Sequence, residues 1–286
     1  MPSIVNNNII SLTAQRNLSV SENSLATAMA RLSSGMRINS AKDDAAGLAI
    51  SERFTSQIRG SNQAARNAND GISLAQTAEG ALGKVSDLFQ RMRELAIQSV
   101  NDTNSNDQRG LLDGEFQQLK QQIDQVAKNT QWNGFAILDG SCGTSGVLSF
   151  QVGSGAGQTL AIELGDFSAS GGIVDAVTSD YAETTPTITI ASADEATASL
   201  GFLDSAMTAL NAKRANMGAV MNRLQHVIDN LINVSSNTTQ SRSTIEDADY
   251  AKVSSSLARA QIIQQAATAV LAQANTSQQT VLKLLQ

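Results

Sequence analysis

The sequence predicts a mainly α-helical protein, in which helices from both chain ends form a long antiparallel coiled-coil rod with a small β-hairpin region. Three observations lead to this fold class. Helical periodicity occupies both ends of the chain, period-two alternation is confined to the middle, and only 3% of the 286 residues are aromatic. Small and polar side chains therefore stand where a globular core carries large ones, which favours thin, elongated packing.

Composition excludes several classes of partner. The net charge is -6 and the basic residues are scattered, so we expect no nucleic acid and no membrane as partners. No run approaches the ~18 consecutive apolar residues of a spanning helix, and the N-terminal segment lacks the features of a cleaved signal peptide. These general rules alone favour a cytosolic protein. The single cysteine, Cys142, cannot form an internal disulfide.

The N-terminal segment carries one apolar stripe, which indicates a helix. Its members recur at helical spacings: Leu18, Leu25, Met29, Leu32 and Met36. Residues 40–43, Ser-Ala-Lys-Asp, have the form of a capping box that would start a second helix.

Residues 44–100 predict one long helix with a coiled-coil seam, because its apolar side chains keep a period of about 3.5 residues. These side chains are Phe54, Ile58, Ala65, Ala68, Ile72, Ala75, Leu82, Val85, Phe89, Met92 and Ala96. The helix would be about 85 Å long and would need a partner along its length. Gly60, Gly71, Gly80 and Gly83 each cost about 1 kcal/mol there relative to Ala. We therefore expect a neighbouring backbone to approach closely at these glycines.

The middle of the chain contains a shorter helix and a hairpin. Residues 105–108 form a capping box before a helix with Leu112, Phe116, Leu119, Ile123 and Val126 on one side. Residues 147–152 and 160–164 alternate around a glycine-rich loop at 153–157, which predicts a β-hairpin. Residues 165–191 are interpreted as a surface insertion with one short strand at 187–190.

The C-terminal part returns to helix. Residues 192–195 open a long helix, whose apolar side carries Leu200, Leu203, Met207, Leu210, Met217, Met221, Leu224, Ile228 and Leu231. Residues 244–247 can cap a last helix, whose apolar side carries Leu257, Ile263, Ala267, Val270, Ala274, Val281 and Leu285. The two terminal stripes have no core of their own. We expect them to be disordered in a monomer and to order against each other and against neighbouring copies.

These patterns divide the chain into five segments, which are residues 1–43, 44–140, 141–192, 193–237 and 238–286.

Several strings closely resemble the two signatures of bacterial flagellins. The longest is LSSGMRINSAKDDAAGLAISERFTSQIR, residues 32–59. Further N-terminal matches lie at residues 66–72, 77–80 and 92–98, and C-terminal matches at 218–224, 243–251 and 271–275. The resemblance covers residues 1–165 and 193–286, so it implies a minimal flagellin with a short central variable region. It implies that residues 1–43 and 238–286 are the N- and C-terminal parts of an inner coiled-coil domain. It also implies that residues 44–140 are the N-terminal part of a helical rod domain, residues 193–237 its C-terminal helix, and residues 141–192 a β-hairpin with a short variable surface insertion.

The resemblance implies a secreted structural subunit with no enzymatic activity, no cofactor and no metal. Such a subunit leaves the cell unfolded through the flagellar type III export channel and self-assembles into the flagellar filament for swimming motility, which replaces the cytosolic expectation. The implied partners are further copies of the chain, an export chaperone, the filament cap and hook-junction proteins. The residues we assign to filament assembly are Leu18, Leu25, Met29, Leu32, Leu257, Ile263, Val270 and Leu285.

The resemblance also implies recognition by host Toll-like receptor 5. The matching receptor-binding residues are Gln90, Arg91, Glu94, Leu95, Gln98 and Glu115. Spacing alone predicts an i, i+3 ion pair between Arg91 and Glu94. Two alternatives remain open: a hook-filament junction protein that caps or joins, and a secreted receptor ligand or adhesin whose polymerisation is secondary.

Other candidate sites have simpler interpretations. His226 is the only histidine, so a helix-surface position is favoured over a catalytic or metal-ligand role. The glycine-rich loop at 153–157 precedes a strand, which favours a hairpin turn over a phosphate-binding loop. Asp247 and Asp249 suit a helix N-terminus. The sequence assigns no role to Cys142.

Overall fold

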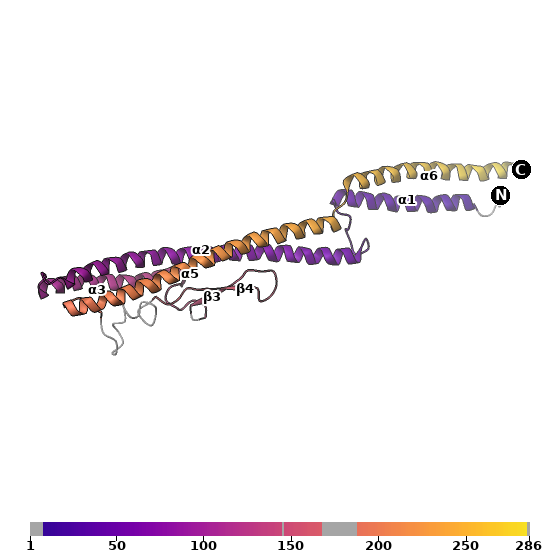
Figure 1. Ribbon diagram of the computed structural model, residues 1–286. Helices are drawn as coiled ribbons and strands as arrows, with labels where there is room; N and C mark the ends of the chain where they lie inside the picture. The colour runs from indigo at the N-terminus through magenta and orange to yellow at the C-terminus, as the bar shows by residue number, and fades with distance from the viewer. Residues whose placement is uncertain (1–7, 145, 168–187, 285–286) are drawn as a thin grey trace. The chain divides into compact units, whose positions relative to one another are not determined.

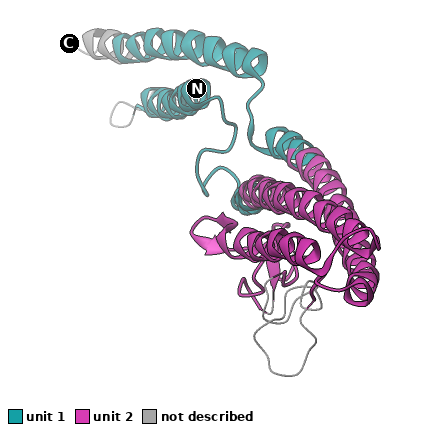
Figure 2. Ribbon diagram, turned by 90° about the vertical axis from the view of Figure 1, so that its left-hand side faces the viewer, with its two compact units in different colours: residues 1–57, 236–286 teal, residues 58–235 magenta. Residues whose placement is uncertain are grey.

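The computed structural model describes residues 8–144, 146–167 and 188–284, and these are mainly helical, as predicted (Figure 1). The helices are α1 (Ile9–Ser34), α2 (Ala45–Val100), α3 (Asn106–Asn129), α5 (Ala193–Glu246) and α6 (Tyr250–Leu284). The strands are β1 (Gln131–Trp132), β2 (Phe135–Ala136), β3 (Val147–Gln151) and β4 (Thr159–Glu163). The chain divides into two compact units (Figure 2): unit 1 comprises residues 1–57 and 236–286, and unit 2 comprises residues 58–235.

In unit 1, α1 and α6 lie side by side and antiparallel (Figure 1). The seam between them consists of small side chains: Ser11, Ala14, Ser21 and Ala28 are buried on α1, and Ala260, Ala267 and Ala274 on α6. Most of these positions are seven residues apart, which is the repeat of a coiled coil. Leucines at the intervening positions, such as Leu18 and Leu257, are half-buried.

Polar contacts link the two helices along this seam. Ser21 Oγ donates a hydrogen bond to the Ala260 carbonyl at 3.1 Å. Near the other end, Asn8 Nδ2 donates to the Ala274 carbonyl at 3.1 Å. Because Ala and Ser side chains are short, the backbones come close enough for a side chain of one helix to reach a carbonyl of the other.

The start of α2 differs from the sequence prediction. Residues 40–43 do not cap it, because the Asp43 carboxylate folds back and accepts hydrogen bonds from the N–H groups of Asn39 and Ser40 and from the Ser40 hydroxyl. Asp44 caps α2 instead, since its Oδ1 accepts from the N–H of Gly47 at 2.9 Å. Asp44 directly precedes the first helical residue, whereas Ser40 is too far away to reach its free N–H groups.

The start of α6 needs a similar correction. Residues 244–247 lie at the end of α5 and do not cap the last helix. The cap is Asp249, whose Oδ1 accepts hydrogen bonds from the N–H groups of Ala251 at 3.0 Å and Lys252 at 3.2 Å. The boundary is ambiguous in the sequence because two candidate carboxylates, Asp247 and Asp249, stand two residues apart.

In unit 2, α2 and α5 run antiparallel. Contacts between them join Asn62 to Ser235, Glu79 to Arg214 and Arg93 to Asp204, so positions rise along α2 as they fall along α5. The core between the helices and the hairpin is fully enclosed. Its largest buried side chains include Leu82, Phe89, Met92, Phe116, Ile123, Ile162 and Phe167.

The predicted capping box before α3 is confirmed. The Gln108 N–H donates to Ser105 Oγ at 3.4 Å, and Gln108 Oε1 accepts from the Ser105 N–H at 2.9 Å. Ser192 caps the start of α5, as predicted: its Oγ accepts from the Glu195 N–H at 3.3 Å, and its hydroxyl donates to Glu195 Oε2 at 2.9 Å.

The predicted β3–β4 hairpin is confirmed, with Leu148 opposite Ile162. The prediction that a neighbouring backbone approaches closely holds at one of the four glycines of α2. A Cβ at Gly60 would meet Ser154 Cβ of the hairpin loop at 2.9 Å and the Ser154 Cα of the backbone at 3.2 Å. A Cβ at Gly71 would meet Leu224 Cδ1 at 3.3 Å, so a side chain and not a backbone comes close there. At Gly80 and Gly83 a Cβ would meet nothing in the described chain within 4 Å, so the prediction is wrong there.

The short strand predicted at 187–190 is not present in its described part, residues 188–190; Thr187 and most of the predicted insertion lie outside the described residues. Asp113 Oδ1 of α3 accepts hydrogen bonds from the Ile190 N–H and the Thr189 hydroxyl, both at 2.9 Å. Gln117 Nε2 donates to the Ile188 carbonyl at 3.1 Å. Because α3 side chains satisfy these backbone groups, the segment needs no partner strand.

Candidate assembly and recognition surfaces

Unit 1 leaves many large apolar side chains exposed. On α1 and α6 they are Ile9, Ile10, Leu12, Val20, Met29, Tyr250, Ile262, Ile263 and Val270. A seam of alanine and serine explains this exposure, because two helices offer each other one narrow stripe and have no third layer to cover the rest.

The residues predicted for filament assembly separate into two groups. Leu18, Leu25, Leu32 and Leu257 are half-buried positions of the α1–α6 seam. Met29, Ile263 and Val270 are exposed, with Met29 at 52%. Leu285 lies outside the described residues. Each of the two apolar stripes predicted from the sequence therefore includes both residues of the seam within the chain and exposed residues that are open to a partner.

The predicted recognition residues lie on α2 and α3 of unit 2. Arg91 is central: its Nε and Nη2 donate to Glu115 Oε1 at 3.0 and 2.9 Å, and its Nη1 donates to Glu94 Oε2 at 3.0 Å. These hydrogen bonds, above all the one to Glu115, raise the pKa of the Arg91 guanidinium above its usual value. The predicted ion pair with Glu94 is confirmed.

Five of the six predicted recognition residues are exposed. Gln90 and Gln98 lie near the Arg91 cluster on α2 and present their side chains to solvent. Leu95 is the exception, because it is 1% exposed and packs in the core of unit 2. Its side chain is unavailable to a receptor, and we remove it from the recognition surface.

Leu111 is a surface residue that sequence analysis missed. It is 78% exposed on α3 and lies four residues before Glu115, so the two side chains share one face of that helix. The sequence does contain a signal for this exposure. Leu111 directly precedes Leu112, and only one of two adjacent leucines on a helix can face the core.

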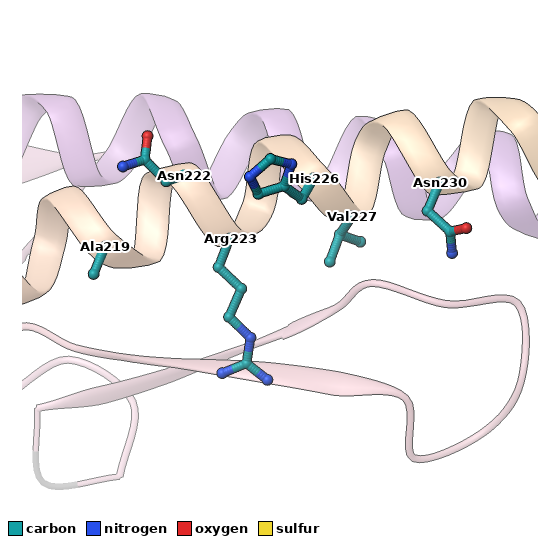
Figure 3. A pocket seen from close by; sticks show the side chains of 6 residues that line it. All are labelled: Ala219, Asn222, Arg223, His226, Val227 and Asn230. Carbon is teal, nitrogen blue, oxygen red and sulfur yellow. The ribbon is translucent and has the colours of Figure 1, made fainter.

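The other candidate sites have structural roles. His226 and Arg223 lie along one side of α5 in a shallow, open groove with Asn222 and Asn230 (Figure 3). In the glycine-rich loop, Gln151 Nε2 donates to the carbonyls of Gly153 and Gly155, which is the expected hairpin turn and not an anion site. Among the described residues no cluster of His, Cys, Asp or Glu could hold a metal ion.

Cys142 is buried, with its Sγ 3.8 Å from the Ile137 carbonyl oxygen. Burial, and secondarily the Asp139 carboxylate, raise the pKa of its thiol, so the reactive thiolate is disfavoured. No described helix is both long and apolar enough to cross a membrane.

Comparisons with known proteins agree with this arrangement. The model of the bacterial flagellin N-terminal helical region matches residues 5–142, and that of the C-terminal helical region matches residues 200–285. A flagellin of Halalkalibacterium halodurans is 42% identical over 99% of both chains. A flagellar filament 31.3 kDa core protein of Treponema maltophilum is 38% identical over 99% of this chain and 100% of its own.

Among solved structures, the crystal structure of Bacillus cereus flagellin superimposes with a TM-score of 0.49 and 31% identity, covering 58% of this chain and 88% of that one. The full-length relatives are flagellins and a filament core protein, so the hook-filament junction alternative is not favoured. Both family regions occur in order, and together they span the helices of both units. The chain therefore belongs to the bacterial flagellin family, whose members are structural subunits of the flagellar filament and not enzymes.

Proposed function

We propose that this chain polymerises through unit 1 into an extracellular flagellar filament that serves swimming motility. The observation that carries the proposal is the exposed apolar surface of α1 and α6, which includes Met29, Ile263 and Val270. Full burial of a side chain of this size stabilises an assembly by about 1.5–3 kcal/mol. Two helices with a small-residue seam cannot bury these side chains themselves, so further copies are the natural partner.

Seeded elongation tests this proposal. Met29→Asn, Ile263→Asn and Val270→Asn should each raise the concentration of monomer left at equilibrium with filaments. The matched controls Met29→Leu, Ile263→Val and Val270→Ile keep the surface apolar and should elongate like the parent. If the asparagine variants elongate normally on filament fragments, this surface does not drive assembly.

We further propose export in an unfolded state through the flagellar type III channel, with an export chaperone, the filament cap and hook-junction proteins as partners. The lone cysteine supports this route, because a chain without an internal disulfide needs no reduction before it unfolds. The thin α1–α6 pair supports it too, since such a pair is marginal outside an assembly. Limited proteolysis of the monomer should trim both ends, to roughly residue 44 and roughly residue 235. A monomer resistant at both ends would contradict the proposal.

The surface formed by Gln90, Arg91, Glu94, Gln98 and Glu115 is proposed as the face recognised by Toll-like receptor 5. Its guanidinium is already positioned by two carboxylates, so a receptor would meet a preorganised charge pattern. Arg91→Ala and Glu115→Ala should lower signalling in a receptor-reporter assay. The exposed Lys84–Asp87 pair, at 3.4 Å on the same helix, offers the controls Lys84→Ala and Asp87→Ala. If all four variants signal equally, this face is not the one that the receptor recognises.

A further inference from the structure

The α1–α6 pair is basic although the chain as a whole is acidic. These helices carry five basic residues, which are Arg16, Arg31, Lys252, Arg259 and Lys283. Their one acidic residue is Glu22, whereas the whole chain has a net charge of -6. Charges on these helices are therefore few and unbalanced, and each can contribute to the choice of partner.

A groove of ≈ 780 Å³ lies within unit 1, where α1 and the start of α6 meet the adjoining connections. We call it the Arg31–Lys252 groove after two of its lining residues. Its lining also includes Arg37 and two carboxylates, Asp247 and Asp249. Both carboxylates already accept hydrogen bonds within the chain, Asp247 from the Ser243 hydroxyl and Asp249 from the first N–H groups of α6.

Arg37 is satisfied too, because its Nη2 donates to the Ile245 carbonyl, but Arg31 and Lys252 are less well satisfied. The Nε of Arg31 is buried and has no hydrogen-bond partner, and its Nη2 is 3.9 Å from Asp43 Oδ1, at the outer limit of an ion pair. No described side chain pairs with the ammonium of Lys252. A buried N–H without an acceptor is unfavourable, and the adjacent positive charge selects an anionic acceptor.

Glu22 is the complementary group on the same helix. It is exposed and has no described partner. It precedes Arg31 by nine residues, which places the two Cα positions about 13.5 Å apart along the helix axis and about 180° apart around it. Glu22 therefore lies on the side of α1 opposite the groove and cannot reach it within one chain.

We propose that the Arg31–Lys252 groove binds the Glu22 carboxylate of a second copy of this chain. An acid on one side of α1 and a basic groove on the other make a head-to-tail contact, which builds an open helical filament when the rotation between copies does not close a ring. The inference rests on the proposed filament function and names one polar contact that would direct copies into register. The exposed apolar surface of α1 and α6 would drive copies to associate, and the contact between Glu22 and the Arg31–Lys252 groove would fix how they are oriented.

A charge-swap experiment on the full chain tests the contact. In seeded elongation, Glu22→Lys and Lys252→Glu should each slow growth by about fivefold or more at low salt, and added salt should weaken the effect. The double variant Glu22→Lys/Lys252→Glu should recover at least half of the lost rate, because the pair is restored with exchanged signs. Glu52→Lys alters another exposed acid of unit 1 and should elongate like the parent.

The outcomes separate the two proposals. If the parent chain fails to elongate on seeds, the filament function itself is wrong. If the parent elongates and Glu22→Lys does too, the Glu22 contact is wrong while the filament function stands. Slow growth of Lys252→Glu with normal growth of Glu22→Lys would mean that another anion occupies the groove, and a double variant without recovery would also overturn the pairing. Unchanged thermal unfolding of unit 2 would confirm that the substitutions leave the compact part of the monomer intact.

Discussion

Arg91 joins α2 to α3 by donating two hydrogen bonds to a single carboxylate oxygen of Glu115. Both side chains remain nearly half exposed, with 49% of Arg91 and 46% of Glu115 accessible to solvent. Water therefore screens the charges, and the pair does more to fix the position of the guanidinium than to stabilise the fold.

The first prediction concerns this pair. Arg91→Ala and Glu115→Ala should each lower the free energy of unfolding by less than about 1 kcal/mol, as is usual for exposed ion pairs. Urea unfolding of the two single variants and the double variant would measure the coupling. A loss above about 2 kcal/mol would mean that the pair supports the core, and a fall in receptor signalling could then reflect misfolding.

The glycines of α2 give a matched pair of substitutions. Gly80→Ala should raise the free energy of unfolding by up to about 1 kcal/mol, because alanine favours the helix and its Cβ meets nothing within 4 Å. Gly60→Ala should lower it, because the new Cβ would lie 2.9 Å from Ser154 Cβ. Thermal unfolding of the monomer checks both. Equal shifts in the same direction would contradict the packing of the hairpin loop on α2.

The α1–α6 seam should reject a large side chain. Ala260→Leu keeps helix propensity almost unchanged but places a branched side chain where the Ser21 hydroxyl reaches the backbone, at a packing cost of about 1–3 kcal/mol. We expect loss of seeded elongation, while Ala260→Ser retains it. Circular dichroism of the monomer shows whether helix content survives. Normal elongation of the leucine variant would show that the helices do not pack through this seam.

Asp43 should make stability depend on pH. The Ser40 hydroxyl, followed by the Asn39 N–H, holds the pKa of the Asp43 carboxyl below its usual value. A carboxyl with a lowered folded pKa contributes stability above its unfolded pKa and loses it as the pH falls through the folded pKa. Asp43→Asn should therefore be less stable than the parent near neutral pH and should converge with it between about pH 4 and pH 2. Urea-induced dissociation of assembled filaments, in which this segment is ordered, gives the comparison across that range; parallel curves would contradict it.

Periodicity was sufficient to predict the helices, because it reports which face a helix must bury. Capping boxes located the starts of α3 and α5 correctly, where one serine and one acceptor stand at the right spacing. The predicted caps are wrong at α2 and α6, where two carboxylates lie one or two residues apart and only the backbone path decides which of them caps the helix. The Asn133–Gly134 turn between β1 and β2, with φ of 47° and 85°, was missed although Asn-Gly is a strong hairpin signal.

The surfaces were harder to predict than the fold. An apolar stripe in the sequence does not distinguish a side chain that faces the other helix, such as Leu25, from one that faces outward, such as Met29. The path of α6 decides which side chains of α1 face it. The seam is lined mainly by alanine and serine, and several larger side chains point away from it. Leu95 was misassigned for the same reason: its neighbours along the sequence are exposed, but its own side chain points to the core.

The seam of unit 1 also has a mechanical consequence. Its alanines at 260, 267 and 274 repeat so regularly that α6 offers α1 nearly the same profile after sliding by one heptad, about 10.5 Å. The Ser21 and Asn8 hydrogen bonds are among the few contacts that distinguish one alignment from the next. The small-residue packing alone therefore tolerates a shifted alignment, and these polar contacts select the alignment that the structure shows.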